Sequence, residues 1–229
     1  MLTPDQSSED IFNRYIAVQQ RLPALRRHPQ TQNISSLLDL TDQIDAFVFD
    51  AFGVLNVGET AIPGAVERIA QLRDAGAEIR VLTNSATFTK AATLLKFQRL
   101  GFSFLPDEII TSRSSALRVL DDRNWGVMTA RDDSLEDIPY GHIRLGDRPQ
   151  DFDAVEGFLF LSTADWTGQH QDILEATLAH KPRRLVIANA DLAAPRDYAF
   201  SLEPGFWGHQ IADKLSVEVE FHGKPFHGV

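Results

Sequence analysis

The chain has 229 residues, of which 43% are hydrophobic and 24% charged, a composition ordinary for a globular protein of one large or two small domains. A formal net charge of −10 argues against bulk nucleic-acid binding, and no apolar run is long enough to cross a bilayer. The absence of cysteine excludes disulfides, thiolate catalysis and Cys-ligated zinc. With no secretion signal at the N-terminus, we expect a cytoplasmic protein. From its charge and composition we expect it to bind small molecules, without nucleic-acid or membrane partners.

Residues 1–40 predict an N-terminal helical extension. The segment from Ser8, a plausible helix cap, to about Gln32 carries apolar side chains at helical spacing and is interrupted by prolines. These apolar side chains are Ile11, Tyr15, Val18 and Leu22. Such a helix is more often a packing or oligomer helix than a functional site, so a homo-oligomer is possible.

Strands and helices alternate after this extension. The order is strand 44–50, helix 63–75, strand 78–84 and helix 88–100. This alternation predicts an α/β fold with a three-layer, doubly wound parallel sheet. The carboxyl ends of parallel neighbours meet at one edge of the sheet, so we expect Asp50 and Thr83 to lie at the edge where such sheets bind ligands.

The region from about Ser112 to Arg183 predicts a second, smaller α/β domain inserted into the first. Its segments are strands at 125–129 and 157–162 and a helix at 169–180. A further strand, 184–189, returns to the main sheet or lies at its border. The predicted division is a core domain formed by 41–111 and 184–229, with 112–183 as the insertion.

The strongest chemical signal is Asp50, which ends a buried strand just before a turn that contains Gly53. A carboxylate in this position is suited to attack phosphorus and form an aspartyl-phosphate, and the backbone N–H groups of the turn are suited to hold the phosphoryl oxygens. The alternative is a strand-ending Asp that only caps the turn.

Six segments in chain order resemble motifs of one family. They are Asp50–Leu55, Gly58–Ala65, Val81–Ser85, Glu108–Arg113, Ile187–Asp191 and His222–Pro225. Together they are similar to the haloacid dehalogenase superfamily, in its class IIA branch of NagD-like and p-nitrophenyl phosphatases. The resemblance runs from about Asp45 to Pro225 and implies a magnesium-dependent phosphatase with an inserted cap domain.

The resemblance also implies roles for individual residues. Asp50 is expected to be the nucleophile and a ligand of Mg²⁺, together with the backbone carbonyl of Phe52. Thr83, with Asn84 and Ser85 beside it, is expected to hydrogen-bond the phosphoryl oxygens, and Gly53 and Asp191 are expected to line the substrate site. Lys224 is expected to neutralise the charge shared by the phosphate and Asp50. These roles suit phosphoryl transfer, which depends on positioning and charge stabilisation.

The chain departs from the family pattern at Phe52. Related phosphatases carry a second Asp at this position, as the general acid for the leaving group, whereas Phe52 has no proton to donate. Loss of a positioned general acid costs about 10²–10⁴-fold in rate. We therefore expect weakened phosphatase activity.

A second departure concerns the last motif of the family. The chain ends at Val229, five residues after Lys224, and the acidic G-D-x-x-x-D motif that completes the magnesium site elsewhere is absent after it. We expect a truncated sequence, a fragment or a shifted reading frame. The segment Gly146–Asp151 fits this pattern but stands before the third motif, so it predicts a surface turn rather than a metal site.

Two further functions stay open. The first is a catalytically inactive, phosphate-binding or regulatory protein, which Phe52 favours. The second is dehalogenase-type chemistry, in which Asp50 attacks carbon without a metal, although the motif around Lys224 argues against it.

Overall fold

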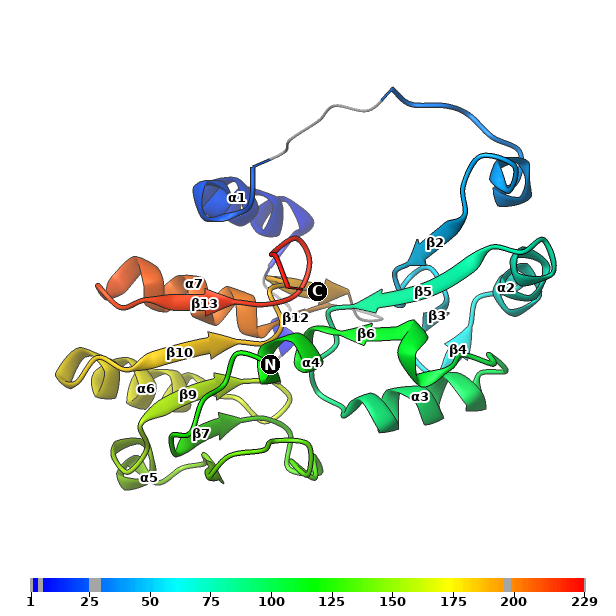
Figure 1. The fold of residues 1–229 in the computed structure, drawn as a ribbon. Helices are drawn as coiled ribbons and strands as arrows, with labels where there is room; N and C mark the ends of the chain where they lie inside the picture. The colour runs from blue at the N-terminus through cyan, green and yellow to red at the C-terminus, as the bar shows by residue number, and fades with distance from the viewer. Residues whose placement is uncertain (1, 4–5, 25–29, 196–198, 229) are drawn as a thin grey trace. The chain divides into compact units, whose positions relative to one another are not determined.

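The computed structural model describes residues 2–3, 6–24, 30–195 and 199–228, which divide into two compact units (Figure 1). Unit 1 is formed from 1–23, 84–89 and 112–229, and unit 2 from 24–83 and 90–111. Residues 25–29 of the predicted N-terminal extension lie outside the described residues. In the part of the chain that is described, no helix is both long and apolar enough to cross a bilayer.

Unit 2 is built on a three-stranded parallel sheet in the order β2-β5-β6. Its elements are η2 (Leu37–Leu40), β2 (Ala46–Phe49), β3 (Asn56–Val57), β4 (Thr60–Ala61), α2 (Ala65–Asp74), β5 (Glu78–Thr83), α3 (Lys90–Arg99), η3 (Pro106–Glu108) and β6 (Ile109–Thr111). The strands and helices predicted between residues 44 and 100 are all present, and no end is shifted by more than two residues. The predicted parallel pairing of the first two strands is confirmed.

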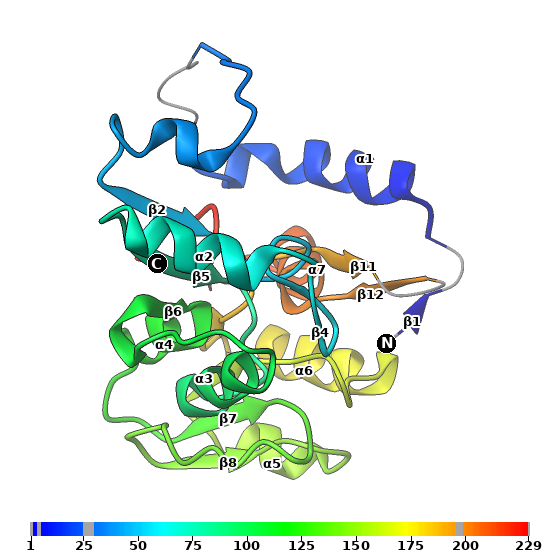
Figure 2. The ribbon, with the colours of Figure 1, turned by 90° about the vertical axis from the view of Figure 1, so that its right-hand side faces the viewer.

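Helices α2 and α3 pack on one face of this sheet (Figure 2). Ile69 and Leu72 of α2 are buried against Ile79 and Val81 of β5, as their helical spacing predicts. On the other face Val48 is 62% exposed. The helices packed on this face hold β2 and β5 in place, and with them the carboxyl ends of the two strands.

Unit 1 contains a five-stranded parallel sheet in the order β13-β10-β9-β7-β8 and a small antiparallel sheet in the order β1-β12-β11. Its elements are β1 (Leu2–Thr3), α1 (Ser8–Val18), η1 (Gln19–Arg21), α4 (Ser112–Leu117), β7 (Trp125–Met128), β8 (His142–Arg144), α5 (Pro149–Asp153), β9 (Gly157–Phe160), α6 (Gly168–His180), β10 (Arg184–Ile187), β11 (Ala193–Pro195), β12 (Phe200–Leu202), α7 (Pro204–Lys214) and β13 (Val219–Phe221).

The five-stranded sheet is packed on both faces, which makes three layers. On one face, Phe158 and Phe160 of β9 pack with α1, α5, α6 and α7. On the other face, Leu159 and Leu161 pack with α4 and the segments before and after it. Because both faces are buried, the strands read as continuous apolar runs, as is usual in parallel sheets. The predicted α/β class is confirmed.

The division into domains differs from the predicted one. Strand β10 pairs in parallel with β9, and β13 pairs with β10, so 184–229 shares a sheet with 112–183. Of the two places predicted for 184–189, in the first sheet or at its border, the pairing with β9 excludes the first. A short, fully apolar strand does not specify its neighbour, because every strand of a parallel sheet presents the same buried pattern.

Helix α1 begins one residue earlier than predicted. Its cap is Ser7, whose Oγ accepts the N–H of Asp10 at 3.1 Å, while Asp10 Oδ2 accepts the N–H of Ser7 at 2.8 Å. This reciprocal pair is a capping box, which satisfies two backbone donors at once. The helix ends at Val18 and continues only as the short turn η1, well before Gln32.

Arg113 of α4 is fully buried and holds the segments on that face of the sheet together. Its guanidinium forms ion pairs with Asp133 and Asp137, both at 2.6 Å, and donates to the carbonyls of Ala86 and Thr87 at 3.2 and 3.3 Å. The side chain of Asp133 is 1% exposed. Removal of the cation would leave a buried carboxylate without its counter-charge.

We expect Arg113→Met to lower the free energy of unfolding of unit 1 by about 3–5 kcal/mol, the usual effect of breaking a buried ion pair. The measurement is urea unfolding followed by tryptophan fluorescence, because all three tryptophans lie in unit 1. Arg131→Met is the matched control, because its ion pair with Asp165 is exposed and worth at most about 1 kcal/mol. Equal losses in the two variants would contradict a structural role for Arg113.

Candidate active site

In unit 2, the site begins where two neighbouring strands end. Asp50 directly follows β2, and Thr83 is the last residue of β5. The two strands are parallel, with Phe49 paired to Val81, so Asp50 and Thr83 lie at the same carboxyl edge of the sheet. Asp50 is exposed, whereas Thr83 is buried. The sequence-based expectation for this pair of residues is confirmed.

The turn after Asp50 is closed by its own backbone. The Ala51 carbonyl accepts the N–H groups of Leu55 at 2.8 Å and Asn56 at 3.1 Å, and the Gly53 N–H donates to the Asn56 carbonyl at 2.8 Å. Gly53 has a φ of +83°, a left-handed conformation that favours glycine. Its N–H is thus already used inside the turn. The need for glycine here is conformational, and the place of Gly53 in the lining of the substrate site stays a prediction.

Phe52 occupies the position where related phosphatases have their general acid, and its side chain is 39% exposed. The ring is not part of the buried core of unit 2. Among the described residues, no backbone hydrogen bond of the turn ends on the Phe52 carbonyl. The position therefore offers a carbonyl oxygen and an aromatic surface, without a proton donor.

In unit 1, Asn84 joins two segments that are distant in the sequence. Its Nδ2 donates to Asp191 Oδ1 at 2.8 Å and to the Lys224 carbonyl at 2.9 Å, and its Oδ1 accepts the Lys224 N–H at 2.6 Å. Both amide protons are thus committed to protein partners. Asn84 positions Asp191 and the backbone of Lys224, and its side chain has no donor left for a phosphoryl oxygen.

The position before Lys224, occupied by Gly223, requires a glycine. Its φ is +101°, and a Cβ there would lie 2.8 Å from Asn84 Oδ1 and 3.2 Å from Ser112 Cβ. Ser112 also donates its hydroxyl to the Asn84 carbonyl at 2.7 Å. Any larger residue would therefore push Asn84 away from Lys224.

Asp191 is held by a chain of polar contacts that the sequence did not reveal. Its N–H donates to Asn189 Oδ1 at 2.9 Å, and Asn189 Nδ2 donates to Glu203 at 3.2 Å. From α1, the Tyr15 hydroxyl accepts the Leu192 N–H at 3.1 Å. Burial, and to a smaller extent the charge of Asp191, raise the pKa of Tyr15. Tyr15 was expected only as a packing residue, and its contact with this segment had no local signal.

The two other predicted residues in unit 1 are Ser85 and Lys224. Ser85 is exposed beside Asn84, and Lys224 is half-buried. Within unit 1, Asn84, Asp191 and Lys224 lie together, and within unit 2, Asp50 and Thr83 do. In the segment Gly146–Asp151, Asp147 pairs with His170 at 2.8 Å and Asp151 pairs with Arg148 at 2.8 Å.

The implied Mg²⁺ has a partial ligand set in unit 2. The Asp50 carboxylate and the Phe52 carbonyl are hard oxygen ligands two residues apart, the type that Mg²⁺ prefers. In the described ranges, no group of three or more His, Asp or Glu side chains could hold a metal ion. The residues fit the ion in ligand type, and the remaining ligands would be substrate oxygens and water, as is common for Mg²⁺.

Comparisons with known proteins agree with the motifs found in the sequence. Residues 47–135 match the family of haloacid dehalogenase-like hydrolases. Human glycerol-3-phosphate phosphatase is 44% identical over 63 residues, which is 28% of this chain and 20% of that protein. The match to this curated relative therefore spans about a fifth of its length.

Two solved structures share the fold. A possible sugar phosphatase of the HAD superfamily from Cytophaga hutchinsonii has a TM-score of 0.73 at 20% identity, with 86% of this chain and 72% of that chain covered. A glycerol phosphate phosphatase from Mycobacterium tuberculosis, in complex with magnesium, has a TM-score of 0.62 at 16% identity, with 81% and 56% covered. Residues 47–135 are thus similar to the haloacid dehalogenase-like hydrolases, and the chain shares its fold with solved structures that include a p-nitrophenyl phosphatase from Archaeoglobus fulgidus and a putative NagD protein.

Proposed function

We propose that this chain hydrolyses small phosphomonoesters through an aspartyl-phosphate on Asp50. The observation that carries the proposal is the position of Asp50 and Thr83 at the carboxyl edge of the parallel pair β2 and β5. A nucleophilic carboxylate and a hydroxyl donor at this edge match the needs of phosphoryl transfer. The relatives named above support phosphomonoesters as the substrate class.

In the proposed reaction, an Asp50 carboxylate oxygen attacks phosphorus, and the ester P–O bond breaks. Thr83 donates a hydrogen bond to a phosphoryl oxygen. The charge-neutralising role of Lys224 stays a prediction from its motif. Water then cleaves the aspartyl-phosphate and releases inorganic phosphate. Bound Mg²⁺, held by Asp50 and the Phe52 carbonyl, would offset the repulsion between the carboxylate and the phosphate.

Asn84 has a different proposed role from the one its motif suggests. Because its side-chain donors are taken by Asp191 and Lys224, we assign it to positioning rather than to phosphate binding. Gly223 serves the same purpose, since it leaves room for the Asn84 side chain. The two residues fix the backbone at Lys224 and thereby restrict where its ammonium group can reach.

The leaving group sets which esters react well. With Phe52 in place of an acid, the departing oxygen receives no proton from this position. p-Nitrophenolate leaves readily without protonation, whereas an alkoxide does not. We therefore expect the chain to favour aryl esters with good leaving groups over alkyl phosphates.

The test is hydrolysis of p-nitrophenyl phosphate with Mg²⁺ and with EDTA. We expect turnover that depends on Mg²⁺ and is inhibited by beryllofluoride, which mimics the phosphoryl group on a carboxylate. Turnover that is unchanged by EDTA would contradict the proposed chemistry. Failure of both turnover and beryllofluoride binding would contradict the proposed site itself.

A second candidate function follows from Phe52 alone. A protein that binds phosphate at Asp50 and Thr83 without turnover would keep this geometry and tolerate an aromatic residue at position 52. Saturable beryllofluoride binding without hydrolysis of any ester would favour this phosphate-binding function over the hydrolase.

A further inference from the structure

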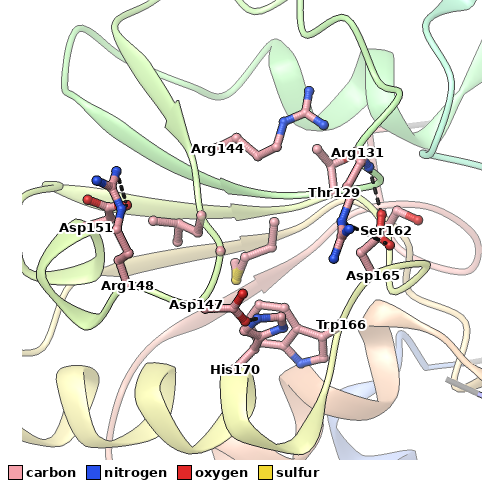
Figure 3. A pocket seen from close by; sticks show the side chains of 13 residues that line it. Thr129, Arg131, Arg144, Asp147, Arg148, Asp151, Ser162, Asp165, Trp166 and His170 are labelled. Atoms are coloured by element: carbon pink, nitrogen blue, oxygen red, sulfur yellow. Dashed lines mark hydrogen bonds and ion pairs between the residues drawn. The ribbon is translucent and has the colours of Figure 1, made fainter.

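A pocket of about 400 Å³ lies within unit 1, and none of the residues assigned above lines it (Figure 3). Its size falls in the lower part of the range of small-molecule sites, roughly 300–1,000 Å³. Its lining includes the charged side chains of Arg131, Arg144, Arg148, Asp147, Asp151 and Asp165 and the ring of His170. None of them belongs to the proposed phosphatase site.

The position of the pocket in the sheet favours a binding site. The pocket-lining residues follow the carboxyl ends of β7, β8 and β9, which are parallel. Strand β7 lies between β8 and β9, so the chain leaves β7 toward one side and later returns on the other. Such a switch point opens a crevice at the carboxyl ends of the strands, where α/β sheets bind ligands.

One wall of the pocket is aromatic and rigid. Trp166 and His170 are buried, and their ring centroids are 5.2 Å apart. The Thr167 N–H donates to His170 Nδ1 at 3.2 Å, so Nδ1 is an acceptor and the proton of the neutral ring is on Nε2. His170 Nε2 then donates to Asp147 at 2.8 Å and orients that carboxylate at the pocket.

Two ion pairs lie on opposite sides of the pocket (Figure 3). Arg148 pairs with Asp151 at 2.8 Å, and Arg131 lies 3.6 Å from Asp165. The guanidinium groups are largely exposed, at 72% for Arg148 and 85% for Arg131. Each pair places N–H donors beside carboxylate acceptors at the pocket rim, and neither pair presents an uncompensated charge to a ligand.

This arrangement matches the chemistry of a polyol. Each hydroxyl group both donates and accepts a hydrogen bond, so it suits a rim where donors and acceptors alternate. The C–H face of a sugar ring suits an aromatic wall. The three carboxylates at the pocket, those of Asp147, Asp151 and Asp165, are balanced by the three guanidinium groups of Arg131, Arg144 and Arg148, so the lining has no net charge that would select a free anion. Arg144 donates to the backbone carbonyls of Ala130 and Asp133.

We propose that this pocket binds a small polyhydroxylated ligand, a sugar or sugar alcohol, with its hydroxyl groups on Asp147, Asp165 and Arg131 and its apolar face toward Trp166. The ligand is either a free sugar or the sugar part of a phosphorylated one. The proposal does not rest on the phosphatase activity, because it concerns binding and holds equally for the Asp50→Asn variant.

The test is NMR titration of the ¹⁵N-labelled chain with D-glucose, D-mannitol and inorganic phosphate. The readout is the Trp166 indole N–H, one of three indole signals, identified by its loss in Trp166→Phe. We expect saturable shifts with D-glucose or D-mannitol, with a dissociation constant on the order of 1 mM. Absence of saturation with both, or a shift with phosphate alone, would overturn the proposal.

Variants separate binding from folding. Asp147→Leu removes an acceptor from the pocket and should weaken sugar binding about tenfold or more. Asp153→Asn is the matched control, because Asp153 is an exposed carboxylate of the same unit that does not line the pocket. Equal affinity in both variants, with unchanged unfolding midpoints, would remove the assignment of Asp147.

Glucose 6-phosphate distinguishes the two sources of the ligand. Tighter binding than D-glucose indicates that the pocket holds the sugar of a phosphorylated substrate. Equal binding indicates a separate sugar ligand. In either case Asp147→Leu should weaken the binding, and no effect of this variant on either compound would contradict the polyol site.

Discussion

Asp50→Asn is expected to reduce hydrolysis of p-nitrophenyl phosphate by about 10³-fold or more, the scale seen when a catalytic nucleophile is removed. The amide keeps the size of the side chain but cannot form an acyl phosphate as the carboxylate does. Because Asp50 is exposed at the end of β2, the substitution disturbs no buried contact of the core. Steady-state rates with Mg²⁺ measure the effect.

Asp45→Asn is the matched control for this prediction. Asp45 is also exposed and precedes the same strand, at its amino end. It should retain full activity, since the amino end of β2 is not the ligand-binding edge. If Asp50→Asn retained the rate of the parent chain, Asp50 would not be the nucleophile, and the proposed mechanism would fail.

Phe52→Asp is expected to raise hydrolysis of an alkyl phosphate such as glycerol 3-phosphate by about 10²–10⁴-fold, the usual contribution of general acid catalysis. The new carboxyl group would protonate the departing alkoxide. The gain with p-nitrophenyl phosphate should be much smaller, because that leaving group departs without protonation. The measurement is the ratio of kcat/KM for the two esters in the parent chain and the variant.

Phe52→Leu separates the acid from the mere loss of an aromatic ring. Phe52 is 39% exposed and lies outside the buried core, so neither substitution should unfold unit 2. The Leu variant should leave the ratio of the two esters unchanged. An equal gain in both variants would mean that the ring blocks the site, and no gain in either would show that a missing proton donor does not limit the rate.

The local pattern of the sequence was sufficient to place Asp50 and Thr83. Alternating strands and helices between residues 44 and 100 imply parallel neighbours, and parallel neighbours end at the same edge. The spacing of Ile69 and Leu72 likewise predicted the buried face of α2. These inferences depend only on short-range periodicity and on the handedness of crossovers, so they need no knowledge of distant contacts.

Only the tertiary structure decided the partners of Asn84 and the neighbours of β10. Asn84 lies 107 residues before Asp191 and 140 before Lys224, and no local pattern encodes which side chain its amide meets. Strand β10 has the apolar run of any strand buried on both faces, so its place beside β9 follows from packing of the whole sheet. The pocket beside Trp166 has the same origin, since its residues come from segments that follow three strands, and these strands become neighbours only when the sheet forms.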